Sequence, residues 1–194
     1  DHTGGVRSPG VMTVVLALVV AAAILVVHWP VLTTKALALD DDQYLTTNKL
    51  VQNPGLSSTG RFISEVMKPS TVKGYYQPLS MISLMLDCAM GGGPRALLPF
   101  HRTSLLLHAA NTALIIVLLY LLFHQTWIAV LVGLLFGMHP MTIEPVAWIG
   151  ERKTVLATFF AIWSIILYVR YARHPAPVLY SASLLMFVLA LLAK

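Results

Sequence analysis

Three adjacent aspartates, Asp40, Asp41 and Asp42, are the residues whose types and spacing most suggest chemistry in this chain. Neighbouring carboxylates repel, so at least one should hold its proton more tightly unless a cation or a hydrogen-bond donor compensates. Such a group could accept a proton from an attacking hydroxyl or hold a divalent cation through its oxygens. A solvated acidic turn would explain the same run, and this alternative stays open.

A second acidic residue, Glu144, lies between two apolar runs, in the segment 139–145. Acidic residues at a membrane boundary are costly to place and tend to be functional. The prolines at 140 and 145 predict irregular backbone, which at membrane depth should line a cavity or pack within protein. His139, at the start of this segment, is a further candidate for the same site.

Basic residues near these acidic groups could bind a phosphate. Arg152 can grip a phosphate in a bidentate manner, and Lys153 follows it directly. For Arg152, an ion pair with Glu151 or a contact with a lipid headgroup explains the charge equally well. His101 and Arg102 are either phosphate ligands or interfacial anchors.

His108 and Asn111 carry a weaker signal. They are three residues apart and therefore share one face of a helix. We interpret them as hydrogen-bonding groups that join neighbouring helices.

The composition restricts the fold class. Of 194 residues, 57% are hydrophobic and 11% are charged, whereas a soluble domain carries about a quarter charged residues. This excludes a disordered chain, a coiled coil, a collagen-like fibre and most soluble enzymes, and it indicates an integral membrane protein. The net charge of +5 on so apolar a chain suggests lipid headgroups or an anionic ligand rather than nucleic acid. The single cysteine excludes an internal disulfide, and no Cys/His spacing resembles a structural zinc site.

Five apolar runs are predicted to cross the bilayer, because a spanning helix needs about 20 mostly apolar residues. The predicted spans are residues 11–29, 103–123, 126–138, 153–170 and 177–193. The third is short, so it is tilted, re-entrant or continued past Pro140. A cleaved signal peptide is the alternative for the first, but its uncharged run exceeds the usual apolar region of about 7–15 residues.

The basic residues Arg7, Arg170 and Arg173 place the N-terminus in the cytoplasm. The long loop 30–100 and the connection 139–153 then lie outside, so both acidic sites reach one face of the membrane.

Within the long loop, residues 78–90 are predicted to form a short apolar helix that lies on the membrane or packs against the bundle. Its predicted apolar face is formed by Leu79, Ile82, Leu86 and Ala89, and Met81, Met85 and Cys88 widen that face.

Five segments follow one another in an order that resembles a known family. They are DDDQYLTTN (40–48), YQPLS (76–80), LHAANT (107–112), HPMTIEPVAW (139–148) and ERK (151–153). The chain from 38 to 194 resembles the N-terminal membrane part of bacterial multi-pass proteins with C-terminal tetratricopeptide repeats. Those proteins are similar to the animal transmembrane and tetratricopeptide-repeat O-mannosyltransferases, which belong to the GT-C class of glycosyltransferases.

The resemblance implies a partial GT-C bundle of helices, with a long outer loop after the first span and an active site on the non-cytoplasmic face. It implies a polyprenyl-phosphate-linked, mannose-like sugar as donor and a protein hydroxyl as acceptor. The paired acidic motif of the family falls on Asp40 and Asp41, with Asp42 as a register alternative, and one carboxylate would orient or deprotonate the acceptor. Arg152 or Lys153 would stabilise the lipid-phosphate leaving group, and Glu144 would shape the pocket.

We therefore expect the N-terminal part of a longer protein of the bacterial inner membrane, without the later spans and the repeats. No metal ligand is assigned, although a divalent cation at the acidic run stays open.

Two other function classes remain. A transporter would place ionisable groups near mid-bilayer beside broken helices, whereas these acidic groups lie at the ends of spans. A non-catalytic scaffold that displays repeats would tolerate replacement of all three aspartates.

Overall fold

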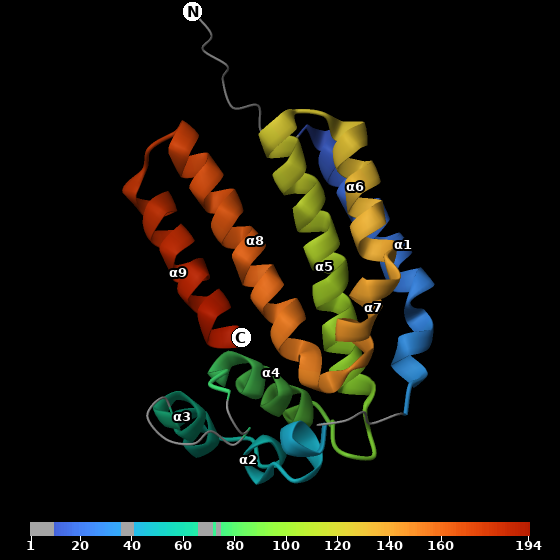
Figure 1. Cartoon of the computed structure of the whole chain (residues 1–194), viewed down its shortest axis with the longest axis vertical. Helices are drawn as coiled ribbons and strands as arrows, with labels where there is room; N and C mark the ends of the chain where they lie inside the picture. Colours follow the sequence, from blue (N-terminus) through green and yellow to red (C-terminus); the bar gives the residue numbers. More distant parts are fainter. Residues whose placement is uncertain (1–9, 36–40, 66–71, 73–74) are drawn as a thin grey trace, which may run out of the picture.

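The computed structural model describes residues 10–35, 41–65, 72 and 75–194. Within these ranges the regular structure is helical, apart from one isolated bridge between Gly93 and Ala96. Long apolar helices pack side by side, and shorter helices form a layer across one end of them (Figure 1). The prediction of an all-α integral membrane protein is confirmed.

In the described part of the chain, five helices form the bundle. They are α1 (Val11–Val27), α5 (Leu98–Phe123), α6 (Thr126–Met138), α8 (Arg152–Arg173) and α9 (Pro177–Ala193). The central helix α5 packs against α1, α6 and α8, and α9 covers the outer side of α8 (Figure 1). A helix therefore corresponds to each predicted span. The helix α1 ends two residues early, at Val27, and α5 begins five residues early because Pro99 suits a first helical turn.

Two segments are long and apolar enough to cross a membrane in the part of the chain that the structure describes. They are α5 and the continuous stretch Ile149–Arg173, which includes α8. The helices α6 and α7 (Pro140–Ala147) meet this criterion only together, as a pair bent by 54°. Because α1 and α9 have 17 residues each, their crossings stay predictions.

The prediction of irregular backbone at 139–145 is wrong, because α7 is helical there. Pro140 occupies the first turn, where a missing N–H costs nothing. The His139 side chain caps the helix, since its Nδ1 accepts a hydrogen bond of 3.2 Å from the Met141 N–H. Pro145 removes a single backbone bond from a helix of 8 residues, and the break at His139 accommodates the bend.

Polar side chains join the helices, as expected for His108 and Asn111. His108 Nε2 lies 3.0 Å from the Gly137 carbonyl of α6, and Asn111 donates to the Val155 carbonyl of α8 at 2.9 Å. In membranes such bonds contribute to helix association together with close van der Waals packing. The interpretation of these two residues as interhelical hydrogen-bonding groups is confirmed.

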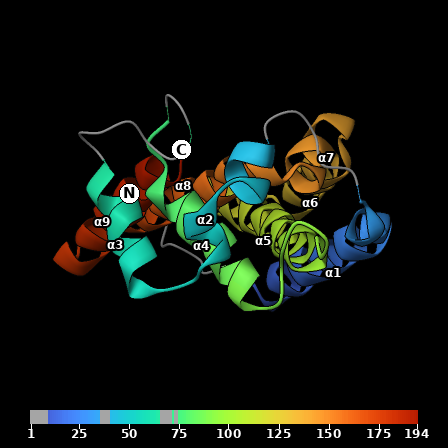
Figure 2. The ribbon, with the colours of Figure 1, turned by 90° about the horizontal axis from the view of Figure 1, so that it is seen from below.

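The layer at the end of the bundle, which we call the cap, comes from the predicted outer loop. It comprises the π-helical turn η2 (Asp42–Thr46), α2 (Lys49–Gln52), α3 (Leu56–Ser64) and α4 (Pro78–Ala89). Seen from below, these elements lie across the ends of α5, α8 and α9 (Figure 2). The cap shares one apolar core with the bundle, because Phe100 of α5 and Ile149 pack against Tyr44, Leu84 and other buried residues.

The apolar face predicted for α4 is partly wrong. Leu86 is 54% exposed, whereas its neighbour Asp87 is 1% exposed. Successive helical residues point about 100° apart, so the inward turn of Asp87 carries Leu86 outward. The cause is an ion pair of Asp87 with the bundle, described below.

Cys88, on the same helix, provides a test of this packing. Burial, together with the charge of Asp87, raises the pKa of the thiol from 9.0 to about 11. Because the thiolate is the reactive form, we expect about 100-fold less of it at pH 8 than in an unperturbed cysteine. Maleimide alkylation of Cys88 should be slow at pH 8 and accelerate towards pH 11, compared with a Ser57→Cys reporter on the exposed side of α3. Equal rates for both sites would contradict the packing of α4.

Candidate functional site

The candidate site lies where the cap meets the bundle, and Asp41 is its acidic member. Asp41 is 1% exposed, and its Oδ1 accepts a hydrogen bond of 2.8 Å from the Gly150 N–H. Gly150 belongs to the short 3-10 helix η4 (Ile149–Glu151), which leads into α8. A Cβ atom at Gly150 would lie 3.1 Å from the Tyr44 ring, so glycine permits the close approach. Asp41 is thereby fixed against the segment that carries the basic pair.

Lys153, in the first turn of α8, is the basic member. Its Nζ lies 3.2 Å from the Tyr44 hydroxyl and 3.2 Å from Glu151 Oε1. The same ammonium lies 5.4 Å from the centre of the Tyr44 ring and 5.2 Å from that of Tyr75, within the range of cation–π attraction. The side chain is 14% exposed, so a ligand can reach it.

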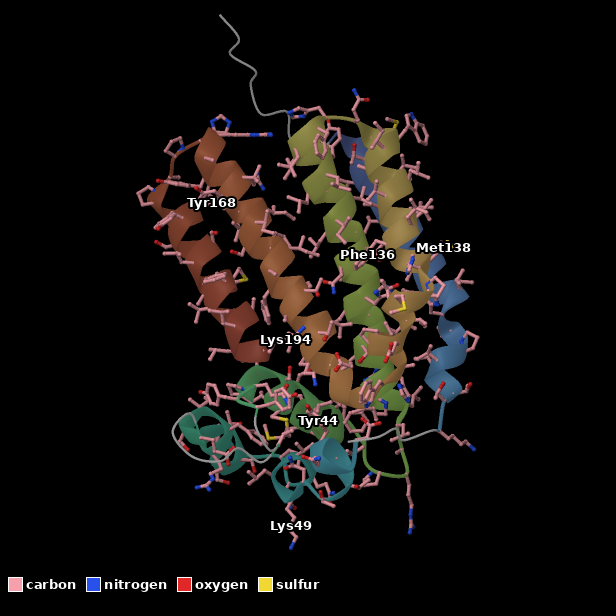
Figure 3. The ribbon with its side chains drawn as sticks, viewed as in Figure 1. Tyr44, Lys49, Phe136, Met138, Tyr168 and Lys194 are labelled. Atoms are coloured by element: carbon pink, nitrogen blue, oxygen red, sulfur yellow. The ribbon has the colours of Figure 1, made fainter. Side chains whose placement is uncertain are left out.

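Tyr44 connects these groups to the cap. It lies at the junction of cap and bundle (Figure 3), one turn after Asp41. Its hydroxyl accepts a hydrogen bond of 2.9 Å from Nε2 of Gln77, which precedes α4. Tyr44 therefore links three segments that are distant in the sequence.

Arg152 is fully buried and belongs to a hydrogen-bond network. Its Nη2 forms an ion pair of 2.7 Å with Asp87 Oδ2 of α4 and donates to the Phe100 carbonyl of α5 at 2.7 Å. The guanidinium also donates to the hydroxyls of Ser104, at 3.1 Å, and Ser83, at 2.8 Å. The second carboxylate oxygen of Asp87 accepts a bond of 2.6 Å from Thr103.

This network changes the interpretation of the basic pair. The partner of Arg152 is Asp87, so the suggested ion pair with Glu151 is wrong. Glu151 instead accepts bonds from Lys153 and from the Thr154 hydroxyl. Because the Arg152 guanidinium already donates to Asp87, the Phe100 carbonyl, Ser83 and Ser104, the structure favours Lys153 as the member of the pair that meets a ligand.

His101, on the first turns of α5, is buried beside this site. In the described part of the chain, neither ring nitrogen has a hydrogen-bond partner. The charges of Asp41 and Arg152 both act on the ring. His101 is thus near the acidic member but buried rather than open to a phosphate.

The remaining predicted site residues do not contact the cluster of Asp41, Tyr44 and Lys153 in the described part of the chain. Arg102 and Glu144 are exposed, and the His139 ring caps α7. Asp40 lies outside the described residues, as does the side chain of Asp42. Among the described residues, no group of three or more His, Cys, Asp or Glu side chains is placed to hold a metal ion.

Several members of the site were missed from the sequence: Tyr44, Gln77, Ser83, Asp87 and Thr103. Asp87 had a usable signal, because it is the one carboxylate in the apolar run 78–90 and a buried carboxylate requires a partner. Tyr44 lay within the quoted acidic segment, but nothing in the spacing linked it to Lys153, which is 109 residues away.

Comparison with known proteins gives partial matches. The chain is 33% identical over 101 residues to the Drosophila melanogaster protein O-mannosyl-transferase Tmtc2, and 35% identical over 97 residues to human protein O-mannosyl-transferase TMTC2. Half of this chain is similar to protein O-mannosyl-transferases. The mouse TMTC2 protein gives the same 35% over 97 residues. These matches cover 50–52% of this chain but only 10–11% of the length of the relatives. No family model matches the chain, and no solved structure matches it significantly.

Proposed function

We propose that this chain is the N-terminal part of a GT-C-class glycosyltransferase of the bacterial inner membrane. It would transfer a mannose-like sugar from a polyprenyl-phosphate donor to a protein hydroxyl at the extracytoplasmic face. The similarity to protein O-mannosyl-transferases supports the reaction class, and the apolar helices support the membrane location.

One observation carries the assignment of the site. The buried Asp41 carboxylate is hydrogen-bonded to Gly150, three residues before Lys153, so the acidic and basic members meet at one end of the bundle. The reaction needs both kinds of group, one for the proton of the acceptor and one for the charge of the leaving phosphate.

In this proposal the acceptor oxygen attacks the anomeric carbon of the sugar, and the bond from that carbon to the phosphate oxygen breaks. The proton of the acceptor hydroxyl passes to a carboxylate of the acidic run, for which Asp41 is the best-supported member. The polyprenyl phosphate leaves with the electron pair of the broken bond, and Lys153 stabilises its negative charge. Arg152 holds the first turn of α8 in place.

The direct experiment supplies labelled polyprenyl-phosphate sugars to the full-length protein in membranes. We expect transfer of label to protein from a mannose donor and weaker transfer, or none, from donors with other sugars. A well-folded protein that transfers no sugar from any donor would reject the proposal and favour a scaffold.

A further inference from the structure

The ammonium of Lys153 is held from several sides before any ligand arrives. We propose that Tyr44 is a positioning residue that directs Lys153 towards the phosphate of the donor. This inference rests on the proposed function, in which Lys153 stabilises the leaving phosphate.

Tyr44 can serve as a fixed point because its own side chain is immobilised. It is 1% exposed, and its ring packs against the backbone of Gly150. Its hydroxyl is held by Gln77 Nε2 at 2.9 Å, and Gln77 is buried as well. A long, flexible lysine side chain bonded to this hydroxyl therefore has a defined end point.

The remaining geometry leaves Lys153 able to bind an anion. An ammonium has three donors, of which one meets the Tyr44 hydroxyl and one meets Glu151 Oε1. Within the described residues the third donor has no partner, and it can bind a phosphate oxygen. The ring of Tyr75, which is exposed, lies 5.2 Å from Nζ.

Fixing a side chain before binding reduces the entropy lost when the ligand arrives. For one flexible side chain the expected effect is about 3–10-fold in affinity. We therefore expect Tyr44→Phe, which keeps the ring but removes the hydroxyl, to lower kcat/KM for the donor by about 3–10-fold. The KM for the protein acceptor should not change.

The matched control is Tyr76→Phe in the same part of the chain. The Tyr76 hydroxyl donates to the Ile63 carbonyl at 2.9 Å and has no contact with Lys153 among the described residues. Both variants would be assayed in the full-length protein with labelled polyprenyl-phosphate mannose, and their unfolding temperatures would be compared with that of the wild type. If Tyr44→Phe fails to fold, Glu151→Ala removes the other hydrogen-bond acceptor of the ammonium at a less buried position, and the same selective loss is expected.

A double-variant comparison separates positioning from a general structural effect. If Tyr44 acts through Lys153, adding Tyr44→Phe to Lys153→Met should cause no further loss of donor kcat/KM. An additional loss of the same size in the double variant would overturn the inference, as would equal behaviour of Tyr44→Phe and Tyr76→Phe. In both cases the wild-type protein still transfers sugar and the proposed function stands. Absence of transfer in the wild type would reject the proposed function and this inference with it.

Discussion

Replacing Arg152 by alanine is expected to destabilise the protein by about 3–5 kcal/mol, because it leaves the buried carboxylate of Asp87 without its ionic partner. The variant also removes the donors that serve Ser83, Ser104 and the Phe100 carbonyl. Since these groups belong to α4 and α5, the cap should detach from the bundle before the helices themselves unfold. Thermal unfolding of the purified protein in detergent would measure the loss.

The matched control is Arg170→Ala, which removes the same side chain from the exposed, opposite end of α8. It should change stability by less than about 0.5 kcal/mol. Combining Asp87→Asn with Arg152→Gln should cost less than the sum of the two single variants, because the pair is then neutral. Strictly additive losses would show that the ion pair is not the link between cap and bundle.

The Asp41→Asn variant is expected to reduce sugar transfer by about 10²–10⁴-fold, the range found when a general base is removed. Asparagine is nearly isosteric, and its side-chain oxygen can still accept the bond from the Gly150 N–H. The protein should therefore fold and accumulate normally, but it would lack the general base that accepts the proton of the acceptor hydroxyl. Initial rates with a labelled donor, normalised to the amount of protein in the membrane, give the ratio.

Glu144→Gln serves as the comparison for Asp41, because Glu144 is exposed on α7 and lies outside the contacts that join Asp41 to η4. A small change is expected there. The neighbouring variants Asp40→Asn and Asp42→Asn test the register of the acidic motif. If Asp40→Asn alone abolishes transfer, the catalytic role belongs to that residue and the assignment to Asp41 is wrong.

The helices could be predicted because their signal is local. Apolar runs of sufficient length indicated each bundle helix, and α6 and α9 have the predicted bounds. The prediction of irregular backbone for the segment 139–145 was wrong for a local reason as well. Both prolines of this segment were treated as helix breakers, although Pro140 is tolerated at the first turn and His139 supplies the cap.

The site could be predicted only in part, because its partners come from distant segments. The acidic run and the basic pair were recognised by residue type, and the structure joins Asp41 to the segment before Lys153. The sequence could not show that Arg152 is buried while Lys153 is partly exposed. Adjacent helical residues point about 100° apart, so either residue could have faced the cap. Only the packing of α4 and α5 decides that Arg152 faces Asp87, which is 65 residues away.

A single measurement tests most directly the claim that this end of the bundle receives the donor. A photoreactive polyprenyl phosphate would be cross-linked to the full-length protein in membranes, and the labelled peptides would be identified by mass spectrometry. The account predicts labels in residues 149–154 or in the adjoining cap, reduced by Lys153→Met. Labels confined to the opposite end of the bundle, in residues 123–127 and 173–177, would contradict it.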